Sequence, residues 1–188
     1  MRFTATAITA TLGFASSAVA APLTARQNTL QDWQVSRVLA TTPSGRPGSE
    51  PWAYIWANVT DPNEITLTGP RGNYTVPAGS QGLNCVARWY TGGDSPVGRT
   101  WPCDSVSDGY WLMTVLEGTD NYISENFSLR FTHVAVGPYM DSAYRKSFEA
   151  EGHFEVGQNL RGLCGGSGAC SWSLKEENNP TEITPSQV

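Results

Sequence analysis

The sequence has few charged residues, no basic run and, after its first twenty residues, no long apolar run. Only 15% of the 188 residues are charged, and the formal net charge at pH 7 is −5. A phosphate backbone or an anionic lipid surface repels an acidic chain that has no cluster of Lys or Arg, so nucleic acid is a poor partner. No later segment is long and apolar enough for a membrane helix, and membrane insertion is not expected.

Histidine is scarce, with two residues in the whole chain, and this limits acid–base and metal chemistry. His133 lies in the apolar register of its strand, which predicts a buried structural histidine. His153 shares the outward register of the next strand with three glutamates: Glu149, Glu151 and Glu155. This array could hold a cation or supply two carboxylates for hydrolysis, but a general acid needs a buried carboxyl group, so a solvated charged face is expected. We predict no catalytic residue, no metal site and no cofactor.

Cysteine is also sparse, and the four residues form two short-range groups, Cys85 with Cys103 and Cys164 with Cys170. Pairing within each group would close loops whose entropy contributes about 3 and about 2 kcal/mol. Four cysteines allow three connectivities, but the glycines between Cys164 and Cys170 permit the tight reversal that a small ring needs. We predict these two disulfides. A zinc site is disfavoured because neither spacing is of the two-to-four-residue kind.

The amino terminus indicates secretion. Residues 1–20 combine one basic residue, a weakly apolar stretch and a small-residue cleavage pattern at Ala18-Val19-Ala20, which is typical of a signal peptide. Residues 21–31 would then form a short pro-segment and an amino-terminal arm, with a second cleavage site after Arg26. Three sequons agree with a glycosylating secretory pathway, at Asn58, Asn73 and Asn126. We predict a secreted, extracellular glycoprotein of eukaryotic origin.

Apolar residues alternate with a period of two in almost every readable segment. The clearest case runs from Phe148 to Val156, where apolar residues alternate with the three glutamates and His153. Turns rich in Gly and Pro separate many such segments, which predicts an all-β fold, a compact antiparallel barrel or sandwich. We expect one β-barrel domain over 32–174. The tail over 175–188 is polar and has no periodicity, and it is predicted to be disordered.

Tryptophan and tyrosine are abundant, with seven of each. In the segment 52–59, the large rings of Trp52, Tyr54 and Trp56 share one register and small or aliphatic residues share the other. The rings either pack into a core or form an exposed platform on which a sugar or an aromatic ligand could stack. Core packing is the preferred interpretation, because aromatic rings dominate β-sandwich interiors. The sequon at Asn58 favours the platform, because it lies in the register of the rings.

The order of these features resembles that of the fungal secreted proteins typified by the Alternaria major allergen. The resemblance spans about Asp32 to Leu174 and consists of Trp33 in an opening strand, Cys85, the Trp101-Pro102-Cys103 group with an aromatic strand after it, the Glu151-Gly152-His153-Phe154 strand, and the closing loop from Cys164 to Cys170. The leader from Ala21 to Gln27 is similar as well. The allergen's covalent dimer uses a cysteine ahead of the barrel. Here no cysteine precedes Cys85, so a covalent dimer is not expected.

The resemblance implies a fungal β-barrel without an established enzymatic activity, which acts as an allergen, as an elicitor of plant defence or as a virulence effector. The implied partner is an extracellular protein of a plant host or a small aromatic ligand. Of the family's residues, only the four cysteines transfer to this chain. The alternative function is that of a small secreted carbohydrate-active or cell-wall-binding protein. An enzyme of this kind would need buried carboxylates that face each other across a cleft.

Overall fold

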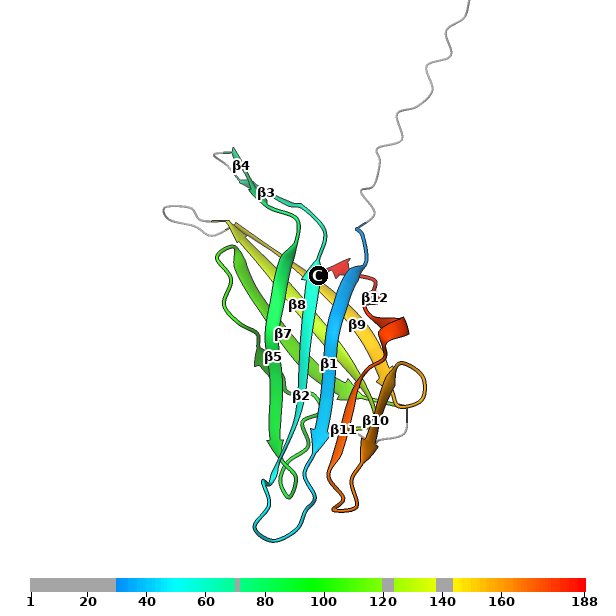
Figure 1. Cartoon of the computed structure of the whole chain (residues 1–188). Helices are drawn as coiled ribbons and strands as arrows, with labels where there is room; N and C mark the ends of the chain where they lie inside the picture. The colour runs from blue at the N-terminus through cyan, green and yellow to red at the C-terminus, as the bar shows by residue number, and fades with distance from the viewer. Residues whose placement is uncertain (1–29, 70–71, 120–123, 138–143) are drawn as a thin grey trace, which may run out of the picture.

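The computed structural model describes residues 30–69, 72–119, 124–137 and 144–188, and these residues form strands almost throughout (Figure 1). The elements are β1 (Trp33–Thr42), β2 (Trp52–Asp61), β3 (Ile65–Gly69), β4 (Gly72–Val76), β5 (Ser80–Tyr90), β6 (Thr100–Pro102), β7 (Gly109–Glu117), β8 (Asn126–Gly137), β9 (Tyr144–Glu155), β10 (Leu160–Cys164), β11 (Cys170–Leu174), the short 3-10 helix η1 (Glu176–Asn178), β12 (Thr181–Ile183) and β13 (Ser186–Gln187).

Two antiparallel sheets pack face to face. The first has the order β10-β11-β1-β2-β5, with β12 also paired to β1, and the second has the order β13-β9-β8-β7-β6. Strands β3 and β4 form a separate hairpin at one end of the molecule (Figure 1). Neither sheet closes on itself, so the all-β antiparallel prediction is confirmed in its sandwich form. The barrel expected over 32–174 is corrected to a sandwich.

Both sheets contribute large rings to the core, but the inward apolar residues of β2 are only small or aliphatic. In the second sheet, large rings point inward from β7, β8 and β9, and Trp111, Phe131 and Phe154 are at most 1% exposed. Strand β9 alternates as expected, since Phe148, Ala150, Gly152 and Phe154 are buried while the glutamates between them reach the surface. From the first sheet, Trp33 and Trp89 also point inward, whereas the middle of β2 and β5 contributes small residues, including Ala53, Ala57 and Ala87, each 0% exposed.

The carboxyl-terminal tail is ordered, which corrects the prediction of disorder over 175–188. We call residues 181–188 the C-terminal strap: β12 pairs with β1 of the first sheet, and β13 pairs with β9 of the second. Ile183 is 4% exposed and lies over Gly152, where an added Cβ would stand 2.9 Å from Ile183 Cγ2. A polar tail with only two buried residues, Ile183 and Pro185, gives little apolar pattern to read, and it takes its order from the strands with which it pairs.

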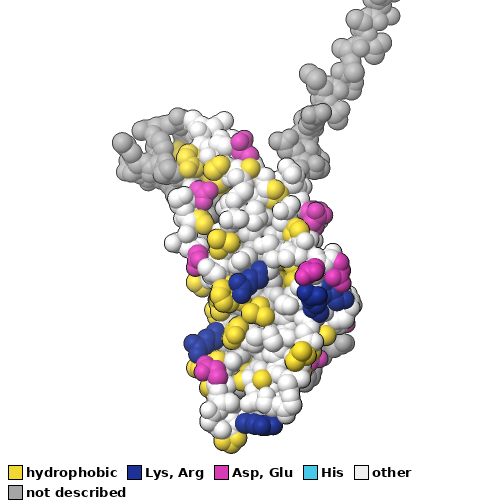
Figure 2. Space-filling view, viewed as in Figure 1, with side chains coloured by type: hydrophobic (Ala, Val, Ile, Leu, Met, Phe, Trp, Pro, Cys, Tyr) yellow, Lys and Arg dark blue, Asp and Glu magenta, His cyan; other side chains and the backbone are white. Residues whose placement is uncertain are grey.

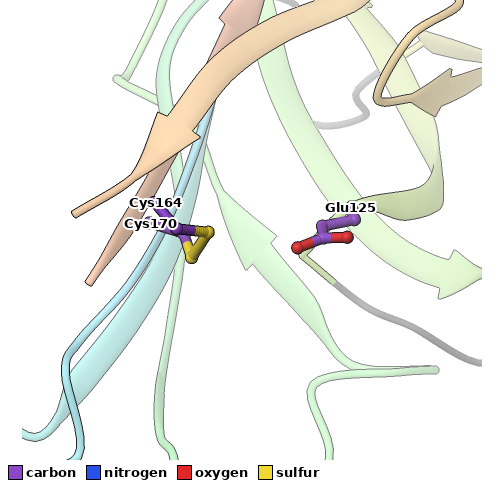
Figure 3. Close-up of side chains that lie close together, drawn as sticks. All are labelled: Glu125, Cys164 and Cys170. Carbon is purple, nitrogen blue, oxygen red and sulfur yellow. A yellow bond between two sulfur atoms is a disulfide. The ribbon is translucent and has the colours of Figure 1, made fainter. Parts of the chain in front are cut away.

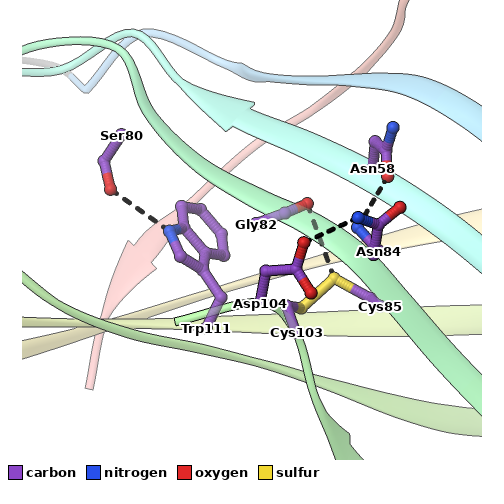
Figure 4. The surroundings of a disulfide bond; sticks show 8 residues. All are labelled: Asn58, Ser80, Gly82, Asn84, Cys85, Cys103, Asp104 and Trp111. Atoms are coloured by element: carbon purple, nitrogen blue, oxygen red, sulfur yellow. Dashed lines mark hydrogen bonds between the residues drawn. A yellow bond between two sulfur atoms is a disulfide. The ribbon is translucent and has the colours of Figure 1, made fainter. Parts of the chain in front are cut away.

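Both predicted disulfides are present, and no free cysteine is found in the described residues. The Cys85–Cys103 bond joins edge strand β5 of the first sheet to the segment after β6 of the second. Around it, Asn84 Nδ2 donates to Asp104 Oδ2 at 2.6 Å (Figure 4). The Cys164–Cys170 bond joins the paired strands β10 and β11. One edge of the sandwich is therefore closed by a covalent bond and the other by the C-terminal strap.

The predicted signal peptide and the Arg26 cleavage site lie outside the described residues. Within the described part of the chain, no helix has the length and apolar character needed to cross a membrane.

The C-terminal strap should contribute measurably to stability. We expect Ile183→Ala to lower the free energy of unfolding by about 2–5 kcal/mol, because it leaves a cavity over Gly152. The exposed neighbour Thr184 provides the control, and Thr184→Ala should change it by less than about 0.5 kcal/mol. Denaturant unfolding monitored by tryptophan fluorescence measures both variants. Equal stability of the two would contradict an anchoring role for Ile183.

Candidate functional site

The rings of β2 lie on the outer side of the first sheet, not in the core. Ala53, Ile55, Ala57 and Val59 are each 0% exposed and occupy the inner side of this strand. The alternation of a strand therefore turns Trp52, Tyr54 and Trp56 outward, with Trp52 37% exposed and the other two half-buried. The core-packing interpretation of these rings is wrong. The alternative arrangement, an outward-facing row of rings, is the one observed, and we call the outer side of β1, β2 and β5 the aromatic face.

Arginine side chains cover two of these rings. The guanidinium carbon of Arg37 lies 4.1 Å from the ring centroid of Trp56, and that of Arg88 lies 4.6 Å from the centroid of Trp52. Tyr90 meets Trp52 edge to face, with 5.9 Å between centroids. Hydrophobic side chains and Lys or Arg side chains accordingly lie side by side over β1, β2 and β5 (Figure 2). Such cation–π pairs hold the guanidinium groups flat against the sheet while leaving their edges in water.

Two polar atoms on the aromatic face lack a hydrogen-bond partner among the described residues. They are Trp56 Nε1 and Thr41 Oγ1, both shielded from solvent. Thr41 lies on β1 directly beside Tyr54, and Leu39 lies beside Trp56, so the two atoms belong to adjacent rows of the face. A buried polar group without a partner costs about 1–3 kcal/mol, and a surface ligand does not contact these two atoms while they stay shielded.

A second constellation lies between the sheets, at the end of β2. Asp61, Ser80 and His133 come from β2, β5 and β8, and all three are buried. His133 Nδ1 lies 2.9 Å from Asp61 Oδ2, and His133 Nε2 lies 3.2 Å from Ser80 Oγ. Trp111 Nε1 donates to the same Ser80 Oγ at 3.2 Å (Figure 4). One set of proton positions satisfies the whole chain: the indole donates to Ser80, the Ser80 hydroxyl donates to His133, and His133 donates to Asp61.

This order of groups matches that of a serine hydrolase triad, but its surroundings are those of a structural network. His133 is 0% exposed and stacks on Trp111, with ring centroids 4.3 Å apart and planes 3° apart. Asp61 Oδ1 is occupied as well, since it accepts from the backbone and side-chain nitrogens of Asn63 at 2.8 and 2.7 Å. The prediction that His133 is a buried structural histidine agrees with this placement.

The outward glutamates of β9 are bound to a cation rather than to each other. Arg130 on β8 lies 2.6 Å from Glu151 Oε1 and 3.8 Å from Glu149 Oε2. The hydrogen bond that Arg130 donates to Glu151 raises the pKa of Arg130. His153 contacts Glu155 at 3.4 Å and Ser128 at 3.1 Å. The arrangement is the solvated charged face that the alternation predicts. The absence of a catalytic role for these acids stays a prediction.

One group of potential metal ligands occurs in the described residues, formed by Glu125, Cys164 and Cys170. Both sulfur atoms are joined in the disulfide toward which the Glu125 carboxylate points (Figure 3). Because a metal binds the thiolate form of cysteine, this group offers one carboxylate and is not a metal centre.

The three sequons differ in accessibility. Asn73 is exposed on the β3–β4 hairpin, and Asn58 is half-buried on the aromatic face, where its Oδ1 accepts from Asn84 N at 2.9 Å. Asn126 is 4% exposed and its Nδ2 donates to Thr119 Oγ1 at 2.7 Å. Because the Asn126 side chain is buried and hydrogen-bonded, the structure disfavours a glycan there, and the glycosylation of all three sequons stays a prediction.

Sequence reasoning missed Asp61, Ser80, Arg37 and Arg88. Asp61 shares the inward register of Val59, which could have marked it as buried, and Arg88 shares the outward register of β5. Arg37 follows a β-bulge between Val35 and Arg37 that shifts the register of β1, and alternation alone does not reveal such a shift.

No family model, no curated protein and no solved structure matches this chain.

The buried network generates a stability prediction. Ser80→Ala leaves Trp111 Nε1 and His133 Nε2 without a partner, and we expect it to lower the free energy of unfolding by about 1–3 kcal/mol for each orphaned group. Ser128→Ala is the matched control, because it breaks a serine–histidine contact on the outer side of the second sheet. Denaturant unfolding compares the two. An esterase activity that disappears in Ser80→Ala would instead make the network catalytic.

The sequons generate a second prediction. In protein secreted from a glycosylating host, we expect a glycan on Asn73 and none on Asn126, because only the former is exposed. Mass spectrometry of peptides, before and after enzymatic deglycosylation, measures the occupancy of each site. A glycan on Asn126 would contradict the buried position of this residue.

Proposed function

We propose that this chain is a secreted, non-enzymatic binding protein that acts at a host interface through its aromatic face. The observation that carries the proposal is the row of Trp52, Tyr54 and Trp56 on the outer side of a sheet. A sandwich of this size gains stability when its rings are inside, so rings that the fold turns outward favour a binding role. The proposed ligand is a host extracellular protein or a small ring-bearing compound that stacks on these side chains.

Two further observations support an extracellular role. Two disulfides fit an oxidising compartment, and the predicted signal sequence gives the route to it. The fungal source, the plant host and the allergen-, elicitor- or effector-like role rest on the resemblance to the Alternaria allergen family. The open sandwich does not add to that resemblance, which implies a barrel.

The alternative function is that of a small carbohydrate-active or cell-wall-binding protein. The same row of rings supports the binding protein. Aromatic side chains in a row on a flat sheet suit the apolar faces of successive sugar rings. The enzymatic form lacks this support, because Glu149 and Glu151 pair with Arg130 and neither is buried.

The test uses ring variants and a panel of flavonoid-like compounds and glycans, with binding measured by calorimetry. We expect Trp52→Ala and Trp56→Ala to stay folded and to lower the affinity for the bound compound by about tenfold or more. Tyr110→Ala is the matched control, because Tyr110 is an aromatic residue on the other sheet and is 43% exposed.

Two results would count against the proposal. One is unchanged affinity in both tryptophan variants, which would move binding away from the aromatic face. The other is a hydrolysed or oxidised product released from any compound of the panel, which would replace a binder with an enzyme.

A further inference from the structure

Charge is divided unequally between the two outer surfaces of the sandwich. Along β1, β2 and β5 the charged residues are Arg37, Asp61 and Arg88, and Asp61 is buried. The outward charges of these three strands are therefore both positive. Strands β8 and β9 of the other sheet carry both signs, with Arg130, Arg145 and Lys146 beside three outward or half-exposed glutamates. On a chain with a net charge of −5, a face whose strands bear only arginines selects for an anionic ligand.

The two arginines are not equivalent. Arg88 NH2 lies 3.1 Å from Glu50 Oε1, an ion pair at the end of the face. Arg37 lies near the centre of the face and has no carboxylate partner among the described residues, although it is held over Trp56. A guanidinium in this position presents its N–H groups at the rim of an aromatic ring, where they can bind a carboxylate in a bidentate manner.

A ligand of this face must both stack on the rings and supply a carboxylate to Arg37. Alternate residues along a strand are about 6.5–7 Å apart, so the three rings of β2 form a row about 13 Å long. Thr41 of β1 lies beside Tyr54 in this row, and Ser171 and Ser173 add hydroxyl groups one strand further out, on β11. Apolar ring faces, hydroxyl groups and carboxylates together are the chemistry of an acidic sugar chain.

We propose that the ligand of the aromatic face is an acidic oligosaccharide, a glycan that carries uronate sugars. This inference rests on the proposed function, because it uses the same rings. The sugar rings stack along Trp52, Tyr54 and Trp56, and a carboxylate binds the guanidinium of Arg37, with Arg88 as a second site once Glu50 is displaced. An acidic peptide shares the charge but not the stacking, so it is the weaker fit to this face.

The test compares two probes that differ in charge. One is a galacturonic acid oligosaccharide, and the other is the same oligosaccharide with its carboxylates methyl-esterified. Calorimetry on the full secreted protein should show that the acidic form binds about tenfold more tightly, because a charge-assisted hydrogen bond is lost with the ester. The binding should weaken as salt is added, since the contact is exposed.

Three variants assign the effect to residues. Arg37→Gln should remove most of the preference for the acidic form, whereas Arg145→Gln, the same change at an exposed site on β9, should keep it. Trp56→Ala should weaken the binding of both forms. All measurements use a Thr60→Val background, which removes the Asn58 sequon from the face while leaving Asn58 in place.

Each contrary result is distinct. Equal affinity for the two oligosaccharides would overturn the inference and leave the proposed function standing. Binding of neither would also overturn it, and the compound panel with the tryptophan variants would then decide the proposed function separately. Competition by a polyglutamate peptide as strong as that of the uronate would replace the sugar by an acidic protein segment.

Discussion

The inner side of β2 accepts little more than small and aliphatic side chains, and the rest of the molecule depends on this constraint. The space between the sheets is filled from the other side by Trp111, Phe131 and Phe154. The fit is close: at Gly82 on β5, an added Cβ would stand 3.0 Å from the Trp111 ring. Trp33 of β1 and Trp89 of β5 also point into this space, so further rings from β2 would overfill the core. The pleat therefore leaves the outer side as the place for the aromatic residues of β2.

Closure of the sandwich holds this arrangement in place. The Cys85–Cys103 bond joins the sheets at the β5 edge, and the C-terminal strap joins them at the β1 and β9 edges. Between them, the chain of hydrogen bonds from Asp61 to Trp111 satisfies buried polar groups that would otherwise destabilise the core. With the two sheets joined in this way, the aromatic face lies on a sheet whose strands are already paired, so a ligand would bind without ordering the backbone.

The sequence predicts those features that depend on local pattern. Alternation identified the half-buried strand of Glu149 and Glu151 and the buried position of His133, and short separation identified both disulfides. It did not decide which side of β2 faces the core, because that depends on the volume left by Trp111 and its neighbours on another sheet. The order of the strap around Ile183 and the burial of Asn126 are likewise set by distant segments. The row of rings was recognisable in the sequence. The positions of Arg37 and Arg88 beside these rings could not be predicted, because they depend on how β1, β2 and β5 pair.

The central claim is that Trp52 and Trp56 lie on a binding face while Trp33 and Trp111 lie in the core. The most direct measurement is a nuclear magnetic resonance titration that follows the indole N–H signals of the seven tryptophans as the galacturonic acid oligosaccharide is added. The account predicts that the Trp52 and Trp56 signals shift progressively and that those of Trp33 and Trp111 stay in place. Shifts confined to other tryptophans, or spread evenly over all of them, would contradict it.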